Sequence, residues 1–144
     1  MVEQQISGIQ PGYEIPTLTK GPITRVQLAK YAGASGDFNP IHLDDEVAQQ
    51  SGVGPTVIAH GMLSMAFIAQ MLTDWVGPTN LRRLSVRFTA MVRPGDILTC
   101  RGRVEQVRTE GERTQADCEV WIDNQRGERV LTGRAVVDLP RHGG

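Results

Sequence analysis

An alternation of apolar and polar residues begins near residue 81 and predicts an antiparallel sheet in the second half of the chain. In the first alternating segment, polar residues separate three apolar side chains: Leu84, Val86 and Phe88. A period of two is typical of a strand that is buried on one face only. Three further segments are expected to be strands: Ile97 to Val107, Gln115 to Ile122 and Arg129 to Leu139. Turn-forming residues separate them: Pro94-Gly95-Asp96, Gly111 and Asp123 to Gly127.

The segment from Gly61 to Val76 is apolar on nearly every side and has no proline before Pro78. Its length favours a buried helix over a strand. One buried helix followed by an antiparallel sheet is an α+β pattern. A sheet wrapped around a single long helix, placed near Ala59 to Val76, buries both the helix and the one-sided strands.

The residues before this helix alternate between short helices and turns. An extended segment is expected around Tyr13 to Leu18. Thr24 and Gln27 have the spacing of a capping box, which predicts a helix that continues to about Tyr31. Two glycines are expected to end that helix: Gly33 and Gly36.

A polar, turn-forming segment follows from Ser35 to Pro40. Asp44 or Asp45 then caps a short helix that ends near Ser51-Gly52. Asp37 and His42 therefore fall on a loop, where proteins commonly display reactive groups.

Composition narrows the class of protein. The 144 residues fit a single domain spanning 1–144, with 40% hydrophobic residues, 22% charged residues and a formal net charge of −1. Lys and Arg form no block, and there are two Trp, two Tyr and three Phe, so no nucleic-acid partner is expected. Cys100 and Cys118 lack the paired spacing of a zinc or redox site and are interpreted as reduced core thiols.

No apolar run approaches the ~20 residues that a membrane-spanning helix needs. The first residues, MVEQQISGIQPGYE, lack the basic start and apolar stretch of a secretory signal. We therefore expect no membrane association and a cytoplasmic location.

The candidate chemistry lies on the turn segment. Asp37 and His42 supply a carboxylate and an imidazole five positions apart, a pair suited to general acid/base work. Taken alone, Asp37 and Asn39 are also ordinary turn formers. Four nearby residues have metal-ligand chemistry: Asp37, His42, Asp44 and His60. Their spacing matches no standard zinc motif, so no metal is expected.

The stretch from Tyr31 to His42 (YAGASGDFNPIH), with Ala48 beyond it, resembles the signature of the MaoC-like, (R)-specific enoyl-thioester hydratases. The main departure is Ala34, where that family usually carries Gly or a larger aliphatic residue. Three more stretches are similar to the family's continuation: Ala59-His60-Gly61-Met62, Val86-Arg87-Phe88 and Val92 to Asp96. The resemblance therefore spans most of the chain.

This resemblance implies a hotdog fold with an overhanging loop and helix around Ser35 to Ser51, and a hydro-lyase activity. A base takes the proton beside the thioester carbonyl and an acid protonates the departing hydroxyl, or the reverse for hydration. Asp37 and His42 are the implied pair, and both act on one water molecule. The backbone N–H of Gly61 is the implied oxyanion donor at the start of the long helix.

The resemblance also implies the remaining assignments. Gly36, Asn39 and Pro40 support the loop, and two residues are candidate substrate contacts: His60 and Met62. His60 is expected to pack or hydrogen-bond near the entry of the long helix rather than to perform chemistry. No cofactor is implied. The substrate is an acyl-CoA or acyl-carrier-protein thioester, and hotdog subunits pair through sheet edges, so we expect a homodimer or a heterodimer with a second hotdog subunit. A hotdog acyl-thioesterase and a non-catalytic acyl-binding subunit are the alternatives.

Overall fold

The structure is a computed structural model that describes residues 8–140. Its elements in chain order are β1 (Glu14–Lys20), α2 (Arg25–Ser35), η1 (Pro40–His42), α3 (Asp45–Gln50), α4 (Gly61–Val76), β2 (Leu81–Phe88), β3 (Leu98–Glu110), β4 (Arg113–Asp123) and β5 (Arg129–Asp138). The η1 element is a single 3₁₀ turn. All four strands predicted in the second half of the chain are present as β2 to β5, and the extended segment predicted near Tyr13 forms the remaining strand, β1.

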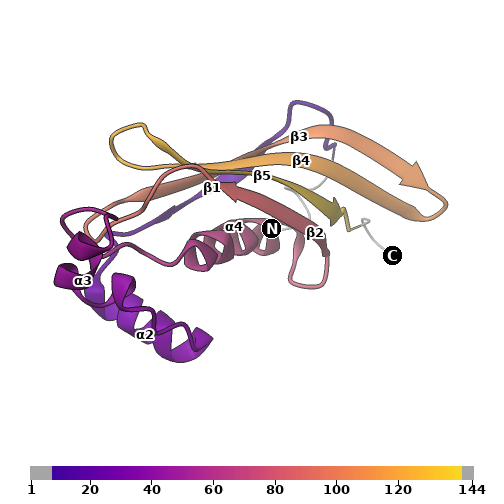
Figure 1. Cartoon of the computed structure of the whole chain (residues 1–144). Helices are drawn as coiled ribbons and strands as arrows, with labels where there is room; N and C mark the ends of the chain where they lie inside the picture. The colour runs from indigo at the N-terminus through magenta and orange to yellow at the C-terminus, as the bar shows by residue number, and fades with distance from the viewer. Residues whose placement is uncertain (1–7, 141–144) are drawn as a thin grey trace.

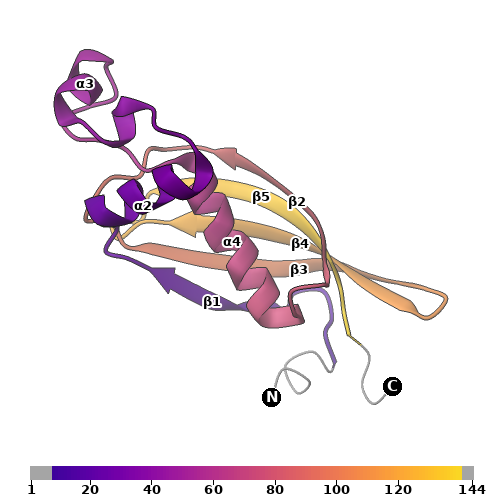
Figure 2. The ribbon, with the colours of Figure 1, turned by 90° about the horizontal axis from the view of Figure 1, so that it is seen from below.

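The strands form one antiparallel sheet in the order β1-β3-β4-β5-β2. The sheet curves over α4, which lies across its concave face (Figure 1). Seen from that face, α2 and α3 lie at the N-terminal end of α4, beyond the edge of the helix–sheet layer (Figure 2). The predicted α+β hotdog fold, with its overhanging segment, is confirmed.

The core lies between α4 and the sheet. The buried side chains of α4 recur every third or fourth position: Leu63, Ser64, Phe67, Ile68, Met71, Leu72, Trp75 and Val76. Its exposed residues lie four positions apart: Met62, Ala66, Gln70 and Asp74. The helix was predicted from a pattern that is apolar on nearly every side. One face is nevertheless open in this chain, because a single sheet covers only the opposite face.

The helix termini before α4 follow local chemistry. The Thr24 hydroxyl accepts a hydrogen bond from the Gln27 N–H at 3.1 Å, which confirms the predicted start of α2. The predicted end near Tyr31 was wrong, because Gly33 lies inside the helix and only Gly36, with φ of 77°, ends it. A glycine within a helix costs only about 1 kcal/mol relative to alanine, so the surrounding turns tolerate it. Asp44, rather than Asp45, caps α3.

The strands β3 and β4 are longer than predicted. Their pairing continues to Glu110 and Arg113, around a turn in which Gly111 has φ of 61°. The other notable strand is β2, which pairs with β5 alone and lies at an edge of the sheet. Among the described residues, no helix is both long and apolar enough to cross a membrane.

Candidate active site

The loop that carries Asp37 and His42 is held by its own side chains. Gly36 ends α2, and the backbone then turns through a series of short polar contacts. The Asp37 carboxylate accepts the Asn39 N–H at 3.2 Å, and the Asn39 side-chain oxygen accepts the Ile41 N–H at 3.2 Å. Asn39 thus caps η1, whose first residue is Pro40. These contacts fix the loop locally, which is why a short motif predicts its shape.

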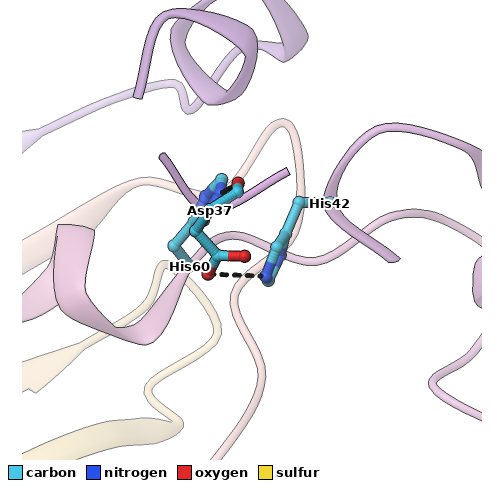
Figure 3. A group of neighbouring side chains, drawn as sticks. All are labelled: Asp37, His42 and His60. Carbon is cyan, nitrogen blue, oxygen red and sulfur yellow. Dashed lines mark hydrogen bonds and ion pairs between the residues drawn. The ribbon is translucent and has the colours of Figure 1, made fainter. Parts of the chain in front are cut away.

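Asp37 and His42 face each other across a short gap (Figure 3). The Nε2 atom of His42 lies 3.7 Å from Oδ2 of Asp37, and the side chains are 8% and 51% exposed respectively. This separation exceeds that of a normal hydrogen bond, so one small polar molecule between the two atoms can contact both. The structure brings together the two residues that the sequence predicts as a pair.

The orientation of the His42 ring is fixed from behind. Its Nδ1 atom lies 2.7 Å from the carbonyl oxygen of Ile58. Because a carbonyl oxygen only accepts hydrogen bonds, Nδ1 carries a hydrogen, and Nε2 is the ring nitrogen that faces Asp37.

His60 packs behind the pair rather than beside the pocket. It is 2% exposed, and its Nε2 atom lies 3.1 Å from the backbone carbonyl oxygen of Asp37. Its ring stacks on His42 with a centroid distance of 3.8 Å and meets Tyr31 edge-on at 4.7 Å. The candidate substrate contact from the sequence thus contacts protein groups in the structure. Met62, the other candidate, is 57% exposed on the open face of α4.

A pocket of about 200 Å³ opens beside His42 and the start of α4, and its wall is mostly apolar. The lining residues that matter here are His42, Gly61, Ser64, Phe88, Met91 and Val130. Ser64 is 4% exposed, and its hydroxyl makes no hydrogen bond within the part of the chain that the structure describes. Ser64 and Val130 could not be identified as pocket residues from the sequence, because one polar residue in an apolar helix and one apolar residue in a strand carry no signal of a pocket.

Gly61 is the first residue of α4, and its backbone lies at the pocket wall. The first N–H groups of a helix have no partner within the helix and carry the positive end of its dipole. A Cβ atom at this position would lie 2.9 Å from the ring of Phe88, so a larger residue here would require that exposed ring to shift. A ligand in the pocket can therefore approach the helix start closely.

Three potential metal ligands lie close together, since atoms of Asp37, His42 and His60 are within 4.8 Å of one another. The two imidazole rings are stacked with an interplanar angle of 23°. Their nitrogen lone pairs lie in the ring planes, so stacked rings direct them side by side and not toward one point. The geometry gives no support to a metal here, and Asp44 is occupied in capping α3. The absence of a metal remains a prediction.

The two cysteines take no part in this site. Cys100 and Cys118 are buried and unpaired with each other, as predicted. Burial raises the pKa of each thiol to about 12. They therefore remain protonated near neutral pH and are poor nucleophiles.

The stretch Val92 to Asp96 resembles a family motif. Two of its residues, Arg93 and Asp96, join Gln125 and Arg126 in a set of contacts that we call the Asp96 clamp. The Arg93 guanidinium donates to the carbonyl oxygens of Val53 and Thr56, at the base of the overhanging segment. The Asp96 carboxylate accepts from the Arg93 N–H at 3.0 Å, from Gln125 at 2.9 Å and from Arg126 at 3.1 Å.

Burial by itself would raise the pKa of Asp96. The hydrogen bonds from Gln125, the Arg93 backbone and Arg126, together with the charge of Arg126, outweigh that effect and lower the pKa. The clamp thus fastens the loop before α4 to the end of the sheet, and it holds the site without contributing a group to the pocket.

A curved antiparallel sheet around one helix, with a carboxylate and an imidazole facing each other at the helix start, defines a hotdog protein with a candidate hydratase site. A family model described as "MaoC like domain" matches residues 8–122. The chain therefore belongs to the MaoC-like family.

Relatives of the chain carry hydro-lyase names. It is 35% identical over 125 residues to an (R)-specific enoyl-CoA hydratase of Rhodospirillum rubrum, covering 84% of this chain and 83% of that protein. It is 32% identical over 126 residues to a 3-hydroxybutyryl-CoA dehydratase of Methylorubrum extorquens, covering 86% of this chain and 78% of that protein.

The fold is similar to that of solved hydratases. The solved structure of an (R)-hydratase from A. caviae, involved in PHA biosynthesis, matches with a TM-score of 0.82 and 29% identity, covering 93% of this chain and 99% of that one. Together with the family match, these relatives place the chain among the enzymes of the hydro-lyase class.

Proposed function

We propose that the protein catalyses the reversible hydration of trans-2-enoyl thioesters to (3R)-3-hydroxyacyl thioesters, with Asp37 and His42 as the acid/base pair. The observation that carries the proposal is the 3.7 Å gap between His42 Nε2 and Asp37 Oδ2, beside an apolar pocket. The two relatives described above are named for the two directions of this reaction. The proposed substrates are thioesters of coenzyme A or of an acyl carrier protein.

The pair works on one water molecule. In hydration, the water oxygen bonds to C3 as one of the two side chains removes its proton, and the resulting enolate takes a proton at C2. Dehydration reverses both transfers, and the hydroxyl at C3 leaves as water. Because Asp37 and His42 face each other across one short gap and act on the same water molecule, both new bonds form on one face of the substrate, which is a syn addition.

Negative charge develops on the thioester oxygen, and the start of α4 stabilises it. The Gly61 N–H is the proposed main donor, aided by the positive end of the helix dipole. Side chains on a helix lean toward its N-terminus, so the unpartnered Ser64 hydroxyl, one turn later, lies toward the same end of the pocket. We assign Ser64 as a second, weaker donor to this oxygen.

Gly36, Asn39 and Pro40 act by shaping the loop. Gly36 has the positive φ that ends α2, Asn39 caps η1, and Pro40 restricts the backbone two residues before His42. None of the three is assigned a proton-transfer role.

A second hotdog subunit, either a copy of this chain or a different one, completes the proposed enzyme. The edge strand β2 has hydrogen-bonding groups that no other described strand pairs. Large apolar side chains near the pocket are also exposed: Phe88 at 48%, Met91 at 46% and Met62 at 57%. Pairing along β2 covers both the open strand edge and this apolar rim. Light scattering coupled to size-exclusion chromatography is expected to give twice the chain mass for a homodimer.

The test uses a short trans-2-enoyl-CoA, such as the four-carbon crotonyl thioester. Loss of the conjugated absorbance without release of thiol is expected. Release of free thiol would instead indicate the thioesterase alternative. If neither change occurs with coenzyme A or carrier-protein substrates although the protein forms a stable dimer, the chain is a non-catalytic acyl-binding subunit. Asp37→Asn serves as the control, because it keeps the size and polarity of the side chain but removes its charge.

A further inference from the structure

We propose that His60 is a positioning residue that fixes the position of Asp37 relative to His42, and this proposal rests on the proposed function of that pair. His60 contacts each of them through a different part of its ring. The edge of the ring reaches the Asp37 backbone carbonyl at 3.1 Å, and the face of the ring stacks on His42 at 3.8 Å. No other described side chain hydrogen-bonds to or stacks on both residues, which makes His60 the link between them.

The place of His60 in the fold is unusual for its residue type. It occupies the N-cap position of α4, where Ser, Thr, Asp or Asn normally bonds a helix N–H with its side chain. The His60 side chain makes no such bond. Its imidazole turns away from the helix and into the overhanging loop, so a capping interaction is given up while a contact to Asp37 is gained.

The hydrogen bond to Asp37 fixes the tautomer of His60. The carbonyl oxygen of Asp37 only accepts, so Nε2 of His60 carries the hydrogen and donates. The remaining atom, Nδ1, is buried and has no partner among the described residues. An unpaired buried nitrogen costs free energy. That an imidazole nevertheless occupies this position indicates that the site needs both its flat ring and its N–H donor.

The stacking contact restrains His42 in a complementary way. Ile58 holds the Nδ1 edge of the His42 ring at 2.7 Å, and His60 covers one face of it. Tyr31 packs edge-on against His60 from α2, at 4.7 Å. The His42 ring therefore cannot rotate freely, and its Nε2 stays directed at Asp37. Because Gly61 follows His60 directly, the same residue also ties the loop to the start of α4.

Two substitutions separate the two contacts. His60→Gln places an amide N–H at the position of Nε2, so it keeps the tether to Asp37 and loses the stack. His60→Phe keeps a stacking ring and loses the donor. His60→Ala loses both. We expect kcat to fall by on the order of 10-fold for Gln and for Phe and by up to about 10²-fold for Ala, with KM within about twofold, since misplaced catalytic groups affect the chemical step.

The matched control is Gln70→Ala, an exposed position on the same helix, for which kcat and thermal stability are expected to match the wild type. Thermal unfolding of each His60 variant shows what fraction is folded at the assay temperature. Wild-type kcat in folded His60→Ala would overturn the proposal. A loss confined to KM would also overturn it, because that result would make His60 a substrate contact.

A second readout does not depend on activity. In the ¹⁵N-histidine NMR spectrum of the wild type, protected ring N–H signals are expected for Nε2 of His60 and Nδ1 of His42. His60→Phe is expected to retain the His42 signal, whereas His60→Gln and His60→Ala are expected to lose its protection. If the wild type hydrates no enoyl thioester, the proposed function fails, and the spectra still decide whether His60 orients His42. Unchanged protection in all three variants would refute the positioning role.

Discussion

The two loop carboxylates Asp37 and Asp96 differ in how completely their oxygens are bonded. Asp96 has a side chain that is 5% exposed, and three groups donate to it. Asp37 is 51% exposed, accepts one backbone N–H and otherwise faces His42 at 3.7 Å. A carboxylate can accept about four hydrogen bonds. Asp96 is thus nearly saturated by the protein, whereas Asp37 keeps lone pairs free for a ligand.

This difference separates a group that holds the structure from a group that is available for chemistry. Both aspartates directly follow a glycine in the sequence, so residue type and the preceding neighbour do not distinguish them. The distinction arises from the partners that the folded chain brings to each. Substitution of the two residues should therefore affect different properties.

The largest expected effect is on catalysis. Asp37→Asn and His42→Ala should each lower kcat/KM by about 10²- to 10⁴-fold, the usual loss for a general acid or base. Asp37→Asn should leave thermal stability nearly unchanged, because the amide oxygen can still accept the Asn39 N–H. The double variant should lose little more than the worse single variant, because both residues act on the same water molecule. Steady-state kinetics with crotonyl-CoA measures this. A double variant that retains most of the wild-type rate would refute the assignment.

The next effect is on stability. Asp96→Ala leaves the Arg93 N–H and the Gln125 amide without their acceptor, so the free energy of unfolding should fall by about 3 kcal/mol. Urea denaturation followed by circular dichroism measures the change. The rate per folded molecule should stay near that of the wild type. Asp74→Ala, at an exposed position of α4, is the matched control and should change stability by less than about 0.5 kcal/mol.

A smaller effect is expected in the pocket wall. Ser64→Ala should lower kcat about 10-fold with little change in stability, because the removed hydroxyl has no hydrogen-bond partner among the residues that the structure describes. Ser64→Thr keeps the donor and is the conservative comparison. Equal rates for wild type and Ser64→Ala would remove Ser64 from the proposed oxyanion site and leave Gly61 as its donor.

The smallest effect is the pH dependence of the stability difference between wild type and Asp96→Ala. The pKa of Asp96 is lowered in the folded protein, so its contribution is fully present above the unfolded pKa of about 3.9. It should be lost as the pH falls through the folded pKa. The slope due to one such group is at most about 1.4 kcal/mol per pH unit. Urea midpoints measured from pH 6 to pH 3 test this, and a difference that grows toward low pH would contradict it.

The sequence predicted those features that depend on neighbouring residues. The Thr24 cap, the loop from Gly36 to His42 and the strand β2 are encoded within a few positions, and the structure contains all three. The alternation in β2 holds for Leu84 and Val86, but Phe88, expected on the same buried face, is 48% exposed. The end of α2 was missed because Gly33 is tolerated inside a helix when the surrounding turns are formed. Burial of α4 was predicted correctly for the face that the sheet covers.

Features that depend on distant residues could not be predicted in this way. The strand order places β2 beside β5 and β1 beside β3, and period-two patterns do not specify such partners. The direction of the His60 ring depends on Tyr31 and Asp37, which lie on other elements. The resemblance identified the motif around Asp96, but its role in clamping residues 53 and 56 emerged from the folded contacts.

The pairing of β2 with β5 has a consequence for synthesis on the ribosome. The residues for water activation and the start of α4 are translated early. Phe88 of β2 and Val130 of β5 both border the pocket, however, and β2 has no neighbour in the sheet until β5 has been made. A nascent chain that still lacks β5 therefore exposes its apolar helix and an unpaired strand. We therefore expect this chain to depend on chaperones most strongly while the final third of it is being translated.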